Sequence, residues 1–504
     1  MRKIAIIDLG SNSAKLIIWE IMEGGAYRIV EKSRDTCRLS EGMGKSNMLT
    51  PQAMMRTIRV LKIFAGLISS YGEVEVFAAA SAAVRRAKNG AEFLRMVRIE
   101  TGITIEVISG QEEAAYDYYG IINTLPINDC LLIDTGGGSV ETVLIKGRKL
   151  ISAAVLPIGS IALREQIEGG RGGMAPDKFY KATHNHAYEK LKEVSWLKEA
   201  RGLPIVAVGG SNRALAHMHM RQTKYPLSRL HGYSMTPDQA RELIENISLT
   251  PESKRMAIAG MEESRIDTIA SGIAPLGAAI KAIKPERIII SECSVREGMF
   301  FKLLMSGQSP PVLPDVLMSS LENTALRYGQ EIKHTRHVAR LCALLYDKTM
   351  ELHGDEGGMR HSLIAAAMLH DIGQAVEYEN HEKHGVYLTL NSPIYGLTHR
   401  ELVITAMLVG MHRINDANED WSTYSALISK QDEEGAKRLG VILKLAEKLD
   451  RNNHGIIEDI EIFASKNEVQ LLLKSPNDTK LQASAAMRQE KAFECIFGRK
   501  LVVI

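Results

Sequence analysis

Two short loops rich in aspartate, glycine and serine contain residue types suited to phosphate chemistry. Residues 8–13 and residues 134–139 each follow an apolar stretch that is typical of a buried strand. Small residues leave backbone N–H groups free to converge on phosphate oxygens. One such loop would usually form only a turn, but two loops in matching positions favour a phosphate site. The predicted phosphate contacts are Ser11, Asn12, Ser13, Gly137, Gly138 and Ser139.

Carboxylates accompany both loops. Asp134 and Glu141 are seven residues apart across the start of a strand, which places them near the same loop. Together with Asp8 they offer hard oxygen ligands, which suit Mg²⁺ and its phosphate counterligands. Neither loop has the lysine pattern of the P-loop proteins, and no GxGxxG fingerprint joins a strand to a helix. The sequence therefore predicts a magnesium and phosphate site of another kind.

The elements that must position these loops predict an α/β arrangement in two related halves. Thr50 can cap a helix that follows the first half's strands, Pro51 suits its first turn, and Gly72 can end it. In each half the loop leaves the first strand of a trio for the second, so we expect two lobes that face a cleft. The predicted trios span residues 4–7, 16–21 and 27–31, and residues 130–133, 141–145 and 150–155.

Six motifs of this region resemble those of the exopolyphosphatase and guanosine pentaphosphate phosphohydrolase (Ppx/GppA) family. They lie at residues 7–13, 81–85, 108–114, 134–141, 209–211 and 230–233. The resemblance covers residues 1 to about 305. It implies an α/β fold of two actin-like (ribonuclease H-like, ASKHA) lobes, at residues 1–125 and 126–305, and the hydrolysis of phosphoanhydride bonds.

The resemblance also implies roles for individual residues. Glu112 is expected to be the general base on the attacking water, with Glu113 as the alternative if the helix turns it inward. Asp134 and Glu141 are expected near Mg²⁺. Arg85 matches the family's phosphate-contacting arginine, a role that suits its planar guanidinium.

Other polar features of this half allow more than one interpretation. Lys15 and Arg265 are further candidates for phosphate contacts. Residues 209–211 lie where actin-like enzymes hold adenosine, and this loop is open to phosphate, to guanosine or to neither.

The second half of the chain has a different pattern. Residues 306–315 contain three prolines, which predict an extended linker. Apolar residues then recur at helical spacing, until strand signals return near Ile460 and at residues 469–473. We expect a mainly helical module at residues 316–455 and a C-terminal α/β extension at residues 456–504.

The helical module resembles the HD phosphohydrolase fold and the C-terminal module of long Ppx/GppA members. The implied metal set is His334, His370, Asp371 and Asp450, which leaves a second divalent metal open. A second interpretation is that the module extends a basic channel for a long polyanion and supports a homodimer. The channel residues would be His381, Lys383, His384 and Arg413.

Composition limits the partners and the compartment. The 504 residues carry 62 Lys and Arg against 60 Asp and Glu, so no global field attracts nucleic acid or membranes. Five widely spaced cysteines form no disulfide framework, which favours the cytoplasm. No segment has the ~20 continuous apolar residues of a membrane span.

The leading hypothesis is a Mg²⁺-dependent exopolyphosphatase that releases orthophosphate from inorganic polyphosphate. The alternative is removal of the 5′ terminal phosphate of guanosine pentaphosphate in the same site. A sugar or acetate kinase and a non-catalytic sensor are hypotheses from other classes. A further one assigns the main reaction to the HD-like module.

Overall fold

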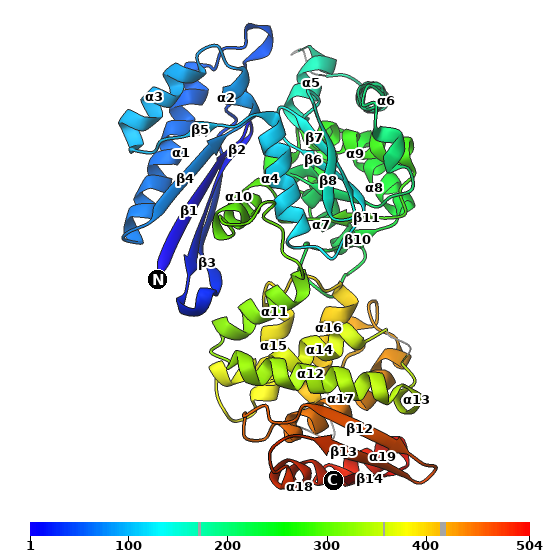
Figure 1. The fold of residues 1–504 in the computed structure, drawn as a ribbon. Helices are drawn as coiled ribbons and strands as arrows, with labels where there is room; N and C mark the ends of the chain where they lie inside the picture. The colour runs from blue at the N-terminus through cyan, green and yellow to red at the C-terminus, as the bar shows by residue number, and fades with distance from the viewer. Residues whose placement is uncertain (170–172, 356–357, 414–419) are drawn as a thin grey trace. The chain divides into compact units, whose positions relative to one another are not determined.

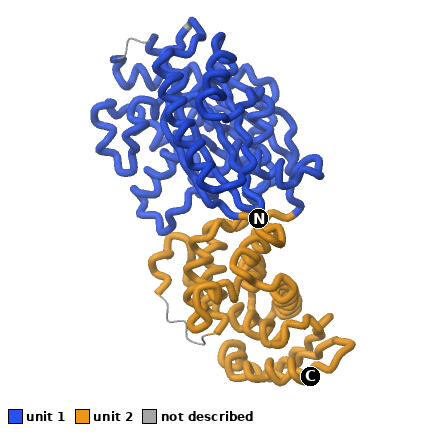
Figure 2. Tube along the Cα trace, turned by 90° about the vertical axis from the view of Figure 1, so that its left-hand side faces the viewer, with its two compact units in different colours: residues 1–21, 28–314 blue, residues 22–27, 315–504 orange. Residues whose placement is uncertain are grey.

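The computed structural model describes residues 1–169, 173–355, 358–413 and 420–504, and the chain divides into two compact units. Unit 1 comprises residues 1–21 and 28–314, and unit 2 comprises residues 22–27 and 315–504 (Figure 2). The division near residue 314 falls within the proline-rich stretch of the sequence.

The first sheet of unit 1 has the strand order β3-β2-β1-β4-β5 (Figure 1). Its strands are β1 (Arg2–Leu9), β2 (Ser13–Ile21), β3 (Tyr27–Thr36), β4 (Glu75–Ala80) and β5 (Glu106–Val107). β1 pairs antiparallel with β2 and parallel with β4. The accompanying helices are α1 (Pro51–Ser70), α2 (Ala82–Arg86) and α3 (Gly90–Thr101), with a 3-10 turn at Gly44–Ser46. Thr50 caps α1 as the sequence predicts, because its side chain accepts a hydrogen bond from the Ala53 N–H.

The second sheet has the order β10-β11-β9-β6-β7-β8. Its strands are β6 (Cys130–Thr135), β7 (Val140–Lys146), β8 (Lys149–Leu156), β9 (Ile205–Val208), β10 (Ser234–Met235) and β11 (Ile288–Ile290). β6 pairs antiparallel with β7 and parallel with β9, which repeats the pairing of β1 with β2 and β4. Its helices are α5 (Ser160–Glu168), α6 (Pro176–Lys192), α7 (Gly210–Gln222), α8 (Pro237–Leu249) and α9 (Ile269–Ile283), with 3-10 turns at Leu197–Ala200, Glu252–Ala257 and Glu263–Arg265.

Two helices cross between the lobes. Helix α4 (Gly110–Ile122) follows the first sheet in sequence but packs in one apolar core with strands of the second sheet. Helix α10 (Val295–Leu304) follows the second sheet in sequence but packs against the first sheet. Its Phe300 ring stacks on Trp19 of β2, with ring centroids 4.1 Å apart. The two helices also contact each other directly. A Cβ at Gly298 would lie 1.8 Å from the Tyr116 carbonyl oxygen, so this crossing requires glycine.

Unit 2 is a helical bundle followed by a small α/β extension. The bundle comprises α11 (Val316–Arg327), α12 (Ile332–Lys348), α13 (Met350–His353), α14 (Arg360–Leu369), α15 (His381–Asn391), α16 (His399–Met411) and α17 (Lys430–Leu449). Shorter 3-10 turns lie at Glu23–Gly25, Ile372–Ala375 and Ser422–Tyr424. The extension comprises β12 (Asp459–Ala464), β13 (Glu468–Lys474), α18 (Lys480–Met487), α19 (Glu490–Phe497) and β14 (Lys500–Val503), with the strand order β12-β13-β14.

The predicted two-lobe α/β fold and the helical character of the second half are confirmed. The edge strand β5 is short, because only Glu106–Val107 pairs with β4. Among the described residues, no helix combines the length and apolarity needed to span a bilayer.

Candidate active site

The strand pairing of the two lobes places the predicted acids at equivalent positions. Asp8 of β1 lies directly opposite Lys15 of β2, and Asp134 of β6 lies directly opposite Glu141 of β7. In the first lobe the pair is neutralised, since Lys15 Nζ lies 2.9 Å from Asp8 Oδ2. In the second lobe both partners are acids. The excess negative charge therefore belongs to the second lobe.

The two glycine- and serine-rich loops meet in one pocket. Each loop is closed by the same turn, with Gly10 N–H donating to Ser13 O and Gly136 N–H to Ser139 O. A Cβ at Gly138 would lie 2.8 Å from Ser11 Oγ, so glycine is needed where the loops approach. All six residues predicted to bind phosphate line this pocket, together with Asp8, Asp134 and Glu141.

Glu113 of α4, rather than Glu112, faces the pocket. Glu112 is exposed and does not line the pocket, because its carboxylate accepts a hydrogen bond from the Ser109 N–H and closes the capping box of α4. Glu113 lines the pocket and its Oε2 lies 3.2 Å from Arg85 Nη1. Burial raises the pKa of Glu113 to about 7, although Arg85 opposes the rise. This position corrects the expectation that Glu112 is the residue that meets the attacking water.

Arg85, predicted to contact phosphate, lies outside the pocket lining and contacts Glu113. Its Nη1 donates to the Ile108 carbonyl oxygen at 2.8 Å as well as contacting Glu113, and it is not among the residues that line the pocket. In this arrangement Arg85 holds the Glu113 carboxylate in place, and its phosphate contact stays a prediction.

The acids of the second lobe lack enough counter-charge, with Glu141 buried and Asp134 half-buried. Burial raises the pKa of Asp134 and raises that of Glu141 well above its usual value, although Lys15 lowers the former and Ser139 donates to the latter at 2.6 Å. Buried carboxylates in this state gain from a divalent cation that restores their charged form. Their oxygen-only chemistry fits Mg²⁺.

Asp117 is a further acid that sequence reasoning missed. It lies one turn after Glu113 on α4, is fully buried, and accepts no hydrogen bond from any donor among the described residues. Burial and the nearby Asp134 and Glu141 raise its pKa well above the usual value, and in the protonated form it can donate to Asp134. The only sequence signal was its i+4 spacing from Glu113.

Four cationic side chains also line the pocket. Lys15 and Arg265 were candidates from the sequence, whereas Arg34 and Arg213 were not. Burial, followed by the charge of Arg265, lowers the pKa of Arg34 to about 10. Mutually repelling cations beside glycine- and serine-rich loops are suited to a polyanion. Arg34 was missed because its strand continues to Thr36, beyond the predicted end at residue 31.

The comparison with known families agrees with this site. Residues 17–306 match the Ppx/GppA phosphatase family, and residues 316–491 match domain III of the Ppx/GppA phosphatases. The chain belongs to the Ppx/GppA phosphatase family. Its two-lobe unit is thus the phosphatase portion, which agrees with the resemblance found in the sequence motifs.

Solved structures of this family are similar in fold. The Ppx/GppA family member of Aquifex aeolicus is 27% identical, with a TM-score of 0.52, and the match covers 61% of this chain and 99% of that one. An exopolyphosphatase from Cytophaga hutchinsonii is 24% identical, with a TM-score of 0.56, over 60% of this chain and 98% of that one.

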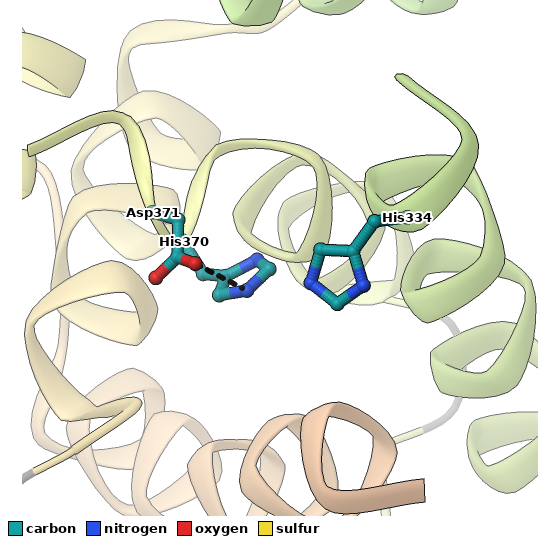
Figure 3. Close-up of side chains that lie close together, drawn as sticks. All are labelled: His334, His370 and Asp371. Atoms are coloured by element: carbon teal, nitrogen blue, oxygen red, sulfur yellow. Dashed lines mark ion pairs between the residues drawn. The ribbon is translucent and has the colours of Figure 1, made fainter. Parts of the chain in front are cut away.

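Domain III of this Ppx/GppA protein brings together part of the predicted second metal set. His334 of α12, His370 at the end of α14 and Asp371 present ligand atoms within 4.8 Å of one another (Figure 3). Asp450 lies outside this group and its Oδ2 is 2.8 Å from His334 Nδ1. Asp450 therefore orients a histidine in this arrangement.

The predicted polyanion channel is only partly exposed. Lys383 and Arg413 are exposed and His384 is half-buried, but His381 is only 3% exposed and its Nε2 lies 3.0 Å from Asp371 Oδ1. His381 therefore lies with the buried residues around Asp371 and not in an open channel, because its helix begins with the imidazole turned towards Asp371.

Proposed function

We propose that unit 1 hydrolyses the terminal phosphoanhydride bond of inorganic polyphosphate in a Mg²⁺-dependent reaction that releases orthophosphate. The observation that carries the proposal is Glu113, a pocket-lining carboxylate held by Arg85, with a pKa raised by burial to about 7. A general base is most effective when its pKa lies near the working pH.

The residues that would hold Mg²⁺ are Asp134 and Glu141, with Asp8 beside them. They offer only oxygen ligands, and among the described residues Asp134 and Glu141 form no ion pair with a basic side chain, which fits a hard divalent cation. When bound, the ion would neutralise charge on the phosphate oxygens.

The chain's own residues account for the remaining steps. Backbone N–H groups and hydroxyls of residues 10–13 and 136–139 bind the oxygens of the terminal phosphate. Glu113 accepts a proton from a water molecule as the water oxygen bonds to the terminal phosphorus. The bond from that phosphorus to the bridging oxygen breaks, and the shortened chain leaves with the bonding electron pair while Lys15, Arg34, Arg213 and Arg265 offset its charge.

Polyphosphate is favoured over guanosine pentaphosphate by the lining of the pocket. Among the residues that the structure describes, none that lines this pocket carries an aromatic ring on which a guanine could stack. The lining instead combines small polar residues with four cations, which suits repeated phosphates. Guanosine pentaphosphate remains the alternative substrate, and a kinase or a sensor is less consistent with a pocket-facing base.

The test compares two adjacent glutamates that differ in position. Orthophosphate release from long-chain polyphosphate and from guanosine pentaphosphate is measured with Mg²⁺ for the wild type, Glu113→Gln and Glu112→Gln. Glu113→Gln should lower kcat by about 10²–10⁴-fold, the usual contribution of a general base. Glu112→Gln keeps the helix cap and should change kcat less than about threefold.

Each outcome has a defined meaning. Faster turnover of polyphosphate supports the leading substrate, and faster turnover of the nucleotide supports the alternative. Equal activity of Glu113→Gln and the wild type would show that Glu113 is not the base.

We also infer that unit 2 is an HD-like module that retains a divalent metal. The support is the convergence of His334, His370 and Asp371 from separate segments of the bundle. The homodimer stays a prediction, to be checked by light scattering.

A further inference from the structure

The buried centre of unit 2 contains more potential metal ligands than the HD-like set predicts. His334, His370 and Asp371 form one group, and Asp371, His381 and His412 form a second, each with its ligand atoms within 4.8 Å. Asp371 is common to both. These five residues, here called the histidine cluster, come from α12, the end of α14, the start of α15 and the end of α16.

Hydrogen bonds fix which ring nitrogen carries the proton in each histidine. Three Nδ1 atoms lie 2.6–2.8 Å from a backbone carbonyl oxygen three residues earlier in the chain. A carbonyl oxygen can only accept, so each of these nitrogens carries a hydrogen, and in the neutral imidazole each Nε2 presents a lone pair. The three histidines are His370, His381 and His412. His334 follows the same rule, with its Nδ1 held by the Asp450 carboxylate.

This arrangement is typical of metal-binding histidines. A metal-ligating imidazole donates its other N–H to a carbonyl or carboxylate, which fixes the ring and raises its basicity. Four imidazoles oriented in this way around one shared carboxylate are more than a structural hydrogen-bond network needs. The Nε2 of His370 in addition is buried and has no hydrogen-bond partner among the described residues.

In the neutral imidazoles, lone pairs also face one another without a donor between them. His381 Nε2 lies 2.9 Å from His412 Nε2 and 3.0 Å from Asp371 Oδ1, and His412 Nε2 lies 3.7 Å from the same oxygen. Three acceptors this close repel one another in a buried site unless a cation lies among them. Metal–nitrogen bonds of about 2.0–2.1 Å place two ligands of one ion up to roughly 4.2 Å apart, and the three separations lie within this limit.

We propose that the histidine cluster binds two first-row divalent transition-metal ions bridged by Asp371, one held by His334 and His370 and the other by His381 and His412. The ligand set is dominated by imidazole, which favours such metals over Mg²⁺. Glu447 of α17 offers a second carboxylate, because its Oε2 is buried and has no partner in the described part of the chain, and its charge acts on His370 and His412.

The competing arrangement needs no metal. A proton on His381 Nε2 could instead be shared with Asp371, while Arg413 Nη1 contacts His381 Nδ1 at 3.2 Å. That arrangement predicts a folded chain that binds no transition metal in unit 2. The number of metal ions bound per chain therefore distinguishes the two-ion arrangement from the metal-free arrangement.

The experiment titrates metal-free full-length protein with Co²⁺ in excess Mg²⁺, which occupies the oxygen-rich site of unit 1. Bound Co²⁺ is counted by elemental analysis after desalting, and its absorption and electron paramagnetic resonance spectra report coordination and coupling. We expect two Co²⁺ per chain with spin coupling between them. Uptake of no Co²⁺, or of one, would overturn the two-ion proposal.

Variants assign the ions to the two groups. His412→Gln and His334→Gln should each bind one Co²⁺ and lose the coupling, and Asp371→Asn should weaken both sites. His353→Gln is the matched control, because His353 is buried in the same unit with both ring nitrogens hydrogen-bonded, and it should bind two. Two ions retained by His412→Gln would refute the assignment of His412 to the second ion. If a variant fails to fold, the number of Co²⁺ ions bound by the wild type still decides between two ions and fewer.

The result is independent of the reaction proposed for unit 1. Mg²⁺-dependent phosphate release should persist in His412→Gln. Loss of release in Glu113→Gln with no Co²⁺ bound to the wild type would defeat only this inference.

Discussion

Replacing Arg85 by methionine should move the pH dependence of hydrolysis rather than simply lower the rate. Arg85 Nη1 lies 3.2 Å from Glu113 Oε2, and both side chains are largely shielded from solvent. At that distance two unit charges interact by about 1 kcal/mol in water and roughly 5 kcal/mol at an effective dielectric constant of 20. One pKa unit corresponds to about 1.36 kcal/mol, so these energies span about 1–4 units. Because the Arg85 side chain is 25% exposed and solvent screens the pair, we expect loss of Arg85 to raise the pKa of Glu113 by the lower part of this range, about 1–2 units.

The sign of the effect follows from the role of the base. Only ionised Glu113 can accept a proton from water, and removing a nearby cation favours the protonated form. The acid limb of the kcat/KM profile should therefore move upward by about 1–2 pH units, with a fall of about 10–100-fold on that limb and recovery at higher pH. The assay is orthophosphate release from polyphosphate across pH 5.5–9.5 (about four units, enough to contain a 1–2 unit shift).

The neighbouring arginine supplies the control. Arg86 is exposed, and Arg86→Met should leave the position of the limb unchanged. A lower plateau and higher KM in Arg85→Met, without any shift of the limb, would refute the positioning role. That result would favour the direct phosphate contact that the sequence motif implies.

Three further substitutions test other parts of unit 1. Arg34→Met should raise KM for polyphosphate about 10-fold or more with a smaller change in kcat, because it removes a charged contact worth about 1.5–3 kcal/mol, and initial-rate kinetics check this. Gly298→Ala should destabilise unit 1 by about 1–3 kcal/mol in urea unfolding, or prevent folding, since the new methyl group meets the Tyr116 carbonyl oxygen. The control is Gly66→Ala, which should not lower the stability of unit 1, because a Cβ at Gly66 meets no atom within 4 Å. Asp117→Asn should raise the Tm of the Mg²⁺-free protein by about 2–4 °C at pH 8 and by less at pH 5. The reason is that the folded-state pKa of Asp117 is raised, so this residue lowers the stability progressively as the pH rises above its unfolded pKa of about 3.9. An unchanged Tm at pH 8 would contradict this reasoning.

The sequence was sufficient for features that depend on neighbouring residues along the chain. The loops at residues 8–13 and 134–139 are recognisable because small residues follow apolar strands, and the structure places both in one pocket. The seven-residue spacing of Asp134 and Glu141 predicts their proximity, since a hairpin brings them directly opposite each other. The cap of α1 at Thr50 is equally local.

The sequence was insufficient where helical phase and distant packing decide. Glu112 and Glu113 have the same chemistry, and only the capping box of α4 turns the first outward and leaves the second facing the pocket. The sequence predicts His381 in an exposed channel, although its ring is buried beside Asp371. Arg34 and Asp117 carry no motif, and their importance follows from burial beside other charges.

Local sequence thus determined which residue types could bind phosphate and metal, and in which family of folds. The tertiary structure alone decided which acid faces the pocket and which histidines share an aspartate, because these depend on rotations about helix axes and on contacts between separate helices of the fold. A rotation of about 100° per residue moves a side chain from solvent to pocket, and neither composition nor motif spacing records which of two adjacent residues it selects.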